Sequence, residues 1–186
     1  MNFLAGVNHV AAVVTKTVEE LVMIGKIDNL FGRMGENLKD SSWLVFRVMS
    51  SAMFMTHGYA KLLGENPQPI TGGGMTNIAI GDLFSYPLPM EINALFIAGV
   101  VELVGGGLIA IGLWTHLTAF IAFFIMVMAY LTAHLAWFPT LNNGELAAMY
   151  ILTYLILFSY GPGQYSVDTW LSVRRQEKRQ AKADGM

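Results

Sequence analysis

The stretch WLVFRVMSSAMFMTHGYAKLL, residues 43–63, decides how this chain is organised. As a helix it would rise by about 30 Å, which is the thickness of the hydrocarbon core of a bilayer. It nevertheless contains Arg47, His57 and Lys61. A charged side chain in hydrocarbon is costly, so it is normally found where it meets a partner or performs a function. Because His57 and Lys61 are four residues apart, they share one helical face, and the stretch predicts a membrane helix with a polar face.

The composition of the whole chain is also that of a membrane protein. Of its 186 residues, 54% are hydrophobic and 13% are charged, and the mean hydropathy is +0.50. The net charge is -2 and the aromatic residues lie in apolar runs, which argues against nucleic acid as a partner. The chain has no cysteine, which excludes disulfides, thiolate metal sites and cysteine nucleophiles. The N-terminus lacks the basic start of a cleaved signal peptide, so we expect none.

Four apolar segments are long enough, or nearly so, to cross a membrane: about 43–63, 89–113, 117–138 and 144–160. Backbone groups inside a bilayer must satisfy their hydrogen bonds within their own segment, so all four should be helices. We therefore predict an all-α integral membrane protein, built as an antiparallel four-helix bundle over residues 43–171.

The basic residues are distributed unevenly around these segments. All but Lys61 lie before or near the start of the first segment or after the last one: Lys16, Lys26, Arg33, Lys39, Arg47, Arg174, Arg175, Lys178, Arg179 and Lys182. By the positive-inside rule both termini are then cytoplasmic. Residues 172–186 are expected to form a basic cytoplasmic tail in contact with anionic lipid, and Arg47 is expected to extend to the headgroups.

Two further segments are longer than a compact bundle needs. Residues 1–42 have apolar positions at helical spacing, interrupted at Gly25, and predict an amphipathic extension. This extension lies along the cytoplasmic interface, docks on a partner, or packs on its own bundle. The outer loop 64–88 contains glycines and prolines and then the apolar stretch 78–86, which could fold back as a cap over the bundle.

One or two titratable side chains from each predicted span fall in the outer half of the membrane: His57, Lys61, Glu102, His134 and Glu145. Such a set could pair into a neutral structural network. It could also bind the two carbonyl groups of a quinone, with a histidine and a carboxylate exchanging the protons of its reduction. A metal site is disfavoured because the Glu-x-x-His spacing of helical di-iron sites is missing. No covalent cofactor is expected.

Three consecutive glycines, Gly105, Gly106 and Gly107, begin one turn after Glu102. Glycines in a membrane helix allow a close approach to its backbone. Here they either pack against a neighbouring helix or form a slot for a flat ligand.

A succession of short motifs runs through the predicted bundle: Arg47, His57-Gly58-x-x-Lys61, Glu102-x-x-Gly105-Gly106, Gly112-Leu113, His134, Asn143-Gly144-Glu145 and Gly161-Pro162-Gly163-x-x-Ser166-x-Asp168. Together they resemble the DoxX family of small four-helix membrane proteins. The resemblance implies a multi-pass protein of a prokaryotic inner membrane. For some relatives it implies a subunit of a thiosulfate:quinone oxidoreductase or association with a terminal quinol oxidase.

These observations lead to two functional hypotheses. The first is a membrane subunit of a respiratory or sulfur-oxidising complex that binds quinone through the outer polar cluster. The second is a non-catalytic accessory or assembly subunit, which the lack of a redox cofactor motif or a stand-alone catalytic motif favours. The expected partners are membrane lipids and either other membrane-protein subunits or further copies of the chain.

Overall fold

The computed structural model describes the backbone of residues 3–185 and the side chains of residues 16–185. The chain divides into two compact units, Met1–Ser42 and Trp43–Met186. Helix α1 (Phe3–Leu63) contributes to both units. The interruption expected at Gly25 does not occur. A single glycine costs a helix only about 1 kcal/mol, and no proline lies between residues 3 and 63 to end it.

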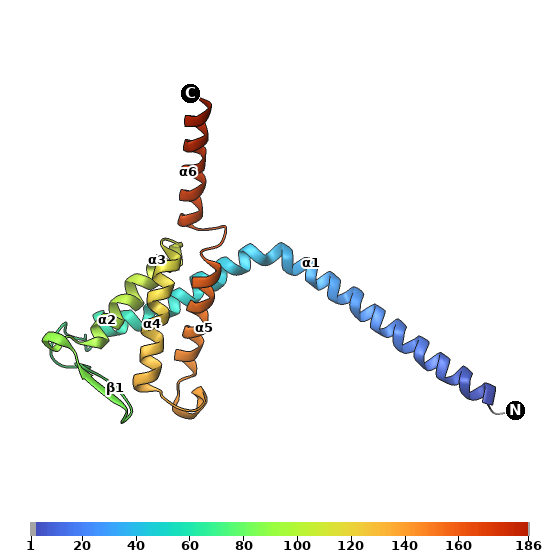
Figure 1. Cartoon of the computed structure of the whole chain (residues 1–186), viewed down its shortest axis with the longest axis horizontal. Coiled ribbons are helices and arrows are strands. Elements are labelled where there is room, and N and C mark those ends of the chain that lie inside the picture. The colour runs from blue at the N-terminus through green and yellow to red at the C-terminus, as the bar shows by residue number, and fades with distance from the viewer. Residues whose placement is uncertain (1–2, 186) are drawn as a thin grey trace. The chain divides into compact units, whose positions relative to one another are not determined.

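The second unit is mostly helical (Figure 1). After α1 its helices are α2 (Ala94–Val100), the π-helical turn η2 (Val101–Gly105), α3 (Gly106–Ile111), α4 (Thr115–Ala133), α5 (Glu145–Tyr160) and α6 (Val167–Asp184). Two 3-10 turns, η1 (Pro89–Glu91) and η3 (Pro139–Asn142), precede α2 and α5. Because η2 follows α2 and precedes α3 without a break, residues 94–111 form one continuous helical segment.

The expectation of an all-α chain is corrected by a short antiparallel hairpin in the loop 64–88. Strand β1 (Asn77–Ile80) pairs with β2 (Phe84–Pro87), with Ile78 opposite Tyr86. β-Branched and aromatic residues favour this pairing, and Gly81 turns the chain at a φ of 52°. The apolar stretch therefore does fold back: β1 packs against α4.

Asn93 holds the base of this loop, although the sequence analysis did not single it out. Its side chain is fully buried and accepts hydrogen bonds from the backbone N–H groups of Met75 and Leu95, at 3.1 and 3.0 Å. Its amide nitrogen donates to the Pro69 carbonyl and to the side chain of Gln68, at 3.0 and 3.1 Å. One asparagine thus caps α2 and ties three points of the loop to it.

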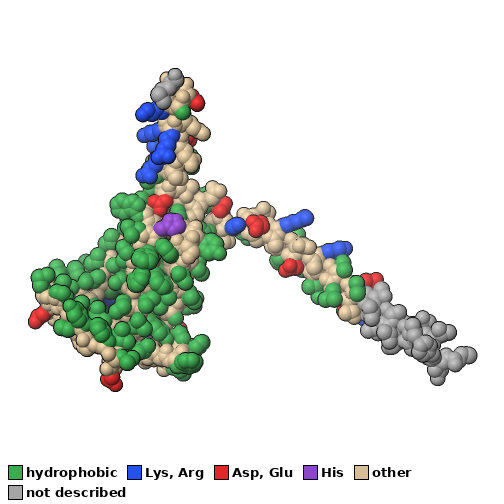
Figure 2. Space-filling model, viewed as in Figure 1, with side chains coloured by type: hydrophobic (Ala, Val, Ile, Leu, Met, Phe, Trp, Pro, Cys, Tyr) green, Lys and Arg blue, Asp and Glu red, His purple; other side chains and the backbone are tan. Residues whose placement is uncertain are grey.

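The buried core of the second unit combines residues of α1, α3, α4 and α5: Phe54, Ile109, Ala119, Ala122, Met126, Ala147, Tyr150, Tyr154 and Leu157. The outer surface of the helices is apolar too, whereas basic side chains gather on α6 (Figure 2). Two segments, Ala94–Ile111 and Thr115–Ala133, are long and apolar enough to cross a membrane, with mean hydropathies of 2.3 and 1.9. Helix α5 is apolar but shorter.

Arg47 does not extend outward to headgroups, which corrects the sequence-based expectation. It is 2% exposed, and its guanidinium donates to the carbonyl oxygens of Ala110, Pro162 and Tyr165. These carbonyls lie near the end of α3 and in the loop after α5, where helix geometry leaves them without intrahelical partners. The guanidinium, with five donors, satisfies all three at once.

Asp168 completes this junction from the first turn of α6. Its carboxylate accepts hydrogen bonds from the backbone N–H groups of Trp114 and Thr115, each at 2.9 Å, and so caps α4. Its own N–H donates to the Gly112 carbonyl at 2.9 Å. The α3–α4 turn and the α5–α6 connection are therefore joined by the hydrogen bonds of Arg47 and Asp168.

We predict that Arg47→Ala lowers the stability of the purified protein by about 3 kcal/mol, because the carbonyls of Ala110, Pro162 and Tyr165 lose their donor and a fully buried side chain is removed. Thermal unfolding in detergent measures this change. The matched control is Arg175→Ala, which removes the same charge from an exposed position on α6. Equal melting temperatures for the two variants would show that the junction contributes nothing.

Candidate functional site

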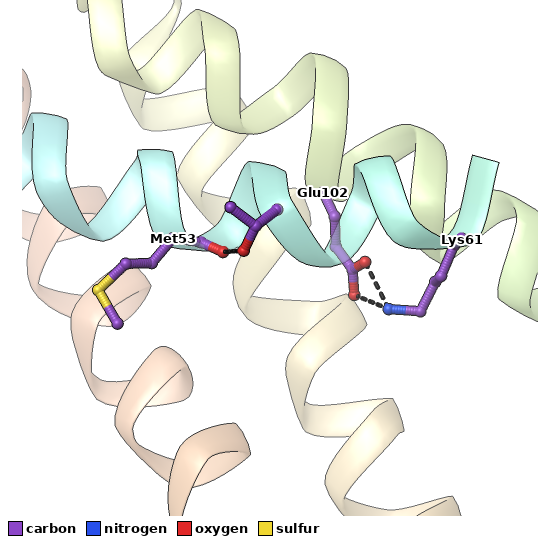
Figure 3. Close-up of polar contacts among 4 residues, drawn as sticks. Met53, Lys61 and Glu102 are labelled. Carbon is purple, nitrogen blue, oxygen red and sulfur yellow. Dashed lines mark hydrogen bonds and ion pairs between the residues drawn. The ribbon is translucent and has the colours of Figure 1, made fainter. Parts of the chain in front are cut away.

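An ion pair joins the last turn of α1 to the π-helical turn η2. The Lys61 Nζ atom lies 2.7 and 2.5 Å from the two carboxylate oxygens of Glu102. Figure 3 shows the lysine reaching this carboxylate from the end of α1. Their side chains are 27% and 6% exposed. Pairing makes the site neutral overall, which is the form in which charged groups are tolerated in apolar surroundings.

The backbone of α1 approaches η2 closely at Gly58. A Cβ atom at this position would lie 2.7 Å from the Gly99 carbonyl oxygen and 2.9 Å from the Glu102 carbonyl carbon. A π turn adds a residue to the helical turn and so changes the direction of the side chains that follow, and such turns are frequent at functional sites. Gly58 and η2 together place Glu102 beside Lys61.

The three glycines after Glu102 lie against neighbouring helices. A Cβ atom on Gly106 would meet Met55 Cγ at 2.7 Å and one on Gly105 would meet Thr118 Cγ2 at 3.3 Å. Gly107 has more room, with Met55 Cε at 3.9 Å. None of the three lines the cavity that lies beside the Lys61–Glu102 pair, so they serve helix packing.

A cavity of about 340 Å³ lies beside the ion pair, between α1, η2, α4 and α5. Its polar walls are His57, Lys61, Glu102, His134, Asn143 and Tyr150, and its apolar walls are Phe54, Met126, Ala129, Leu146 and Ala147. Cavities of this volume, with apolar walls and a few polar groups, are typical of small-molecule sites.

Four of the five predicted site residues line this cavity, and Glu145 does not. Glu145 is exposed in the first turn of α5. The residues of α5 that line the cavity are Leu146, Ala147 and Tyr150, at the spacing of one helical face, and Glu145 lies off that face. As an acid in a first turn, it stabilises the positive start of the helix.

Two tyrosines of α5 were not predicted from the sequence as part of the site. Tyr150 and Tyr154 are 5% and 0% exposed, their rings stack at 5.9 Å, and the His57 ring lies edge-on to Tyr150 at 6.0 Å. Both hydroxyls are buried without a hydrogen bond to any described residue. Buried tyrosine hydroxyls normally have partners, so the hydroxyl of Tyr150, which lines the cavity, is available to a ligand or to water. Their four-residue spacing in an apolar helix was the signal that could have revealed them.

The two cavity histidines differ in their contacts. The Nδ1 atom of His134 lies 3.0 Å from the carbonyl oxygen of Asn142. A carbonyl only accepts, so Nδ1 carries the proton and Nε2 is the acceptor when the ring is neutral. His57 is exposed and contacts the cavity from α1. Across residues 16–185, no three or more His, Asp or Glu side chains are grouped so that they could hold a metal ion.

These features define a small, mostly helical protein with apolar helices and a polar cavity between them, which indicates a membrane protein. The chain belongs to the DoxX family, whose model matches residues 42–135. It is 40% identical over 127 residues to an uncharacterized protein of Haemophilus influenzae, a match that covers 66% of this chain and 84% of that relative. No solved structure matches the chain.

We predict that the Lys61–Glu102 pair is energetically coupled. Lys61→Met or Glu102→Gln alone should destabilise the protein by about 2 kcal/mol, because each leaves a largely buried charge without its partner. The double variant should lose less than the sum of the two, by about 1 to 2 kcal/mol. Unfolding of all four proteins in detergent and denaturant measures the cycle. Strict additivity would mean that the pair does not interact in solution.

Proposed function

We propose that this protein crosses the membrane four times, with both termini in the cytoplasm. The spans are residues 43–63 of α1, the segment α2–η2–α3, α4 and α5. Large apolar side chains on the outside of these helices support contact with lipid: Val45, Met49, Val104, Ile111, Leu117, Phe120, Phe124, Met149, Leu152 and Leu155 are all exposed. Helix α5 has 16 residues and rises by about 24 Å, which suffices for the inner part of a bilayer.

The chain's lack of cysteine makes this topology directly testable. Ser85→Cys in β2 should react with a membrane-impermeant maleimide on intact cells, whereas Ser172→Cys on α6 should react only after the membrane is opened. Both positions are exposed on the protein surface, so a failure to label reports the membrane barrier and not burial of the cysteine. Labelling of Ser172→Cys in intact cells, or protection of Ser85→Cys, would overturn the proposed orientation.

We further propose that the polar cavity binds the head group of a quinone. The observation that carries this proposal is the combination of donors and apolar walls in one cavity near the outer ends of α1 and α4. A quinone ring presents two carbonyl acceptors on opposite edges and two flat apolar faces. The Tyr150 hydroxyl, the Lys61 ammonium and the His57 ring supply donors, and Phe54 and Met126 supply apolar surface.

Reduction of a bound quinone to its quinol takes up two electrons and two protons. Glu102 and the cavity histidines are groups that can exchange those protons with the ring. The sequence has no redox cofactor motif, so the electrons would come from a redox centre in a partner subunit. This assigns to the chain the role of a quinone-binding membrane subunit of a respiratory or sulfur-oxidising complex.

The second candidate is an accessory or assembly subunit that does not bind quinone. It is favoured by the apolar residues that helix α1 exposes between residues 24 and 38: Ile24, Ile27, Leu30, Phe31, Met34 and Leu38 are each at least half exposed. These lie on one face of the helix, as expected of a surface that meets a partner or the bilayer. Purification in mild detergent distinguishes the candidates, because a lone chain or homodimer that still binds quinone supports the first.

We predict that Tyr150→Phe weakens binding of a tailless benzoquinone to the protein in nanodiscs by about five- to tenfold, since one hydrogen bond is lost. Glu102→Gln should weaken it similarly, because Lys61 loses the carboxylate that holds its ammonium group in the cavity wall. The control is Tyr59→Phe, which removes a hydroxyl from an exposed tyrosine of α1. Fluorescence quenching measures the affinities. If the wild-type protein binds no quinone, this proposed function is wrong.

A further inference from the structure

A second cavity lies under the hairpin, and its walls are apolar. It has a volume of about 210 Å³ and is bounded by the loop and β1 on one side and by α2 and α4 on the other. Its walls include Met75, Ile78, Ala98, Met128, Ala129 and Thr132. Thr132 is the one polar side chain among the described residues of this wall, and its hydroxyl donates to the Met128 carbonyl at 2.8 Å. The wall therefore offers no free hydrogen-bond donor from a side chain, which favours an apolar occupant.

The two cavities share one lining residue. Ala129 of α4 lines both the polar cavity and the apolar one. On the facing segment, Ala98 lines the apolar cavity and Glu102, about one turn further, lines the polar cavity. A polar cavity and an apolar cavity thus lie at successive positions along the α2–η2 segment and α4, and Ala129 belongs to the walls of both.

We propose that the apolar cavity holds the first part of the isoprenoid tail of a quinone whose head group occupies the polar cavity, an inference that rests on the proposed function. The order of the cavities matches such a ligand, which has a polar ring at one end and a flexible hydrocarbon chain at the other. Empty apolar cavities cost stability because their walls lose packing contacts, so an apolar chain in this space stabilises the fold.

Hydrogen bonds hold in place the loop residues on the hairpin side of this cavity. Met75 is tied to α2 twice, since its N–H donates to Asn93 Oδ1 at 3.1 Å and its carbonyl accepts from the Ala94 N–H at 2.8 Å. The Leu88 N–H donates to the Thr76 carbonyl at 2.8 Å, which closes the base of the hairpin. These bonds keep Met75 and Ile78 over α2 and α4, so the cavity is preformed and its occupant is selected by shape.

The test compares a tailless benzoquinone with the same ring carrying a tail of two isoprene units, both titrated into the full-length protein in nanodiscs. In the wild-type protein the tail should raise affinity at least tenfold beyond its effect on partitioning into protein-free nanodiscs. Ala98→Leu fills the apolar cavity and should remove that gain, while binding of the tailless quinone stays unchanged. Retention of tailless binding also shows that the variant is folded.

Two matched variants complete the test. Ala52→Leu adds the same side chain to an exposed position of α1 that lines neither cavity, and it should leave both affinities unchanged. Ala98→Leu combined with Met128→Ala returns volume to the apolar cavity and should restore the gain from the tail.

The outcomes separate this inference from the proposed function. If the tailless quinone binds but the tail adds nothing in either protein, the tail site is wrong and the quinone-binding role stands. If neither quinone binds, the proposed function fails and the tail site fails with it. Extraction of the purified wild-type protein should yield an isoprenoid quinone that Ala98→Leu lacks. Recovery of phospholipid alone would overturn the assignment of this cavity.

Discussion

The close backbone contact between Gly58 of α1 and the turn η2 is the constraint on which the site depends. A side chain at position 58 would collide with the backbone of residues 99–103. Without one, α1 lies directly against η2, and Lys61, one turn further along, reaches Glu102 at 2.5 and 2.7 Å. The ion pair in turn neutralises a carboxylate that could not remain charged alone in apolar surroundings. The polar cavity is built around this pair.

The polar groups at the Arg47–Asp168 junction and those in the cavity wall differ in their hydrogen bonding. This difference distinguishes residues that stabilise the fold from residues that can bind a ligand. Around Arg47 and Asp168, donors and acceptors meet their partners within the fold. In the cavity wall, the Tyr150 hydroxyl is buried without a partner among the described residues. A satisfied network stabilises a fold and has nothing left to offer a ligand, whereas unsatisfied donors beside a cavity are where a ligand gains hydrogen bonds.

The helical segments and most of the site could be predicted because both rest on local rules. Hydrophobic length indicated the helices, and α4 and α5 begin and end within a few residues of the predicted limits. The cost of charge in apolar surroundings indicated that His57, Lys61 and Glu102 need partners. Glu145 was predicted to belong to the site, but it lies off the face of α5 that lines the cavity. Which residues share that face can be assigned only when the first residue of α5 is known, and the turn η3 sets where α5 begins.

The features that were missed depend on contacts between segments distant in sequence. Arg47 was expected at the headgroups, since the carbonyls that bind it belong to residues more than sixty positions away. Asn93 ties a loop together through partners up to 25 residues away, and the hairpin it supports creates the apolar cavity. The π turn η2 has no sequence signature and follows from packing against α1.

The sequence by itself determined that this chain is a mostly helical DoxX protein whose apolar helices carry a few charges, because hydrophobic length and charge cost are properties of each segment alone. Only the tertiary structure decided which charges meet. It buried Arg47 against the carbonyl oxygens of three distant residues, left Glu145 exposed and placed Tyr150 beside a cavity with its hydroxyl unpaired. The physical reason is that a hydrogen bond depends on the positions of both partners, and those positions are set by how whole helices pack.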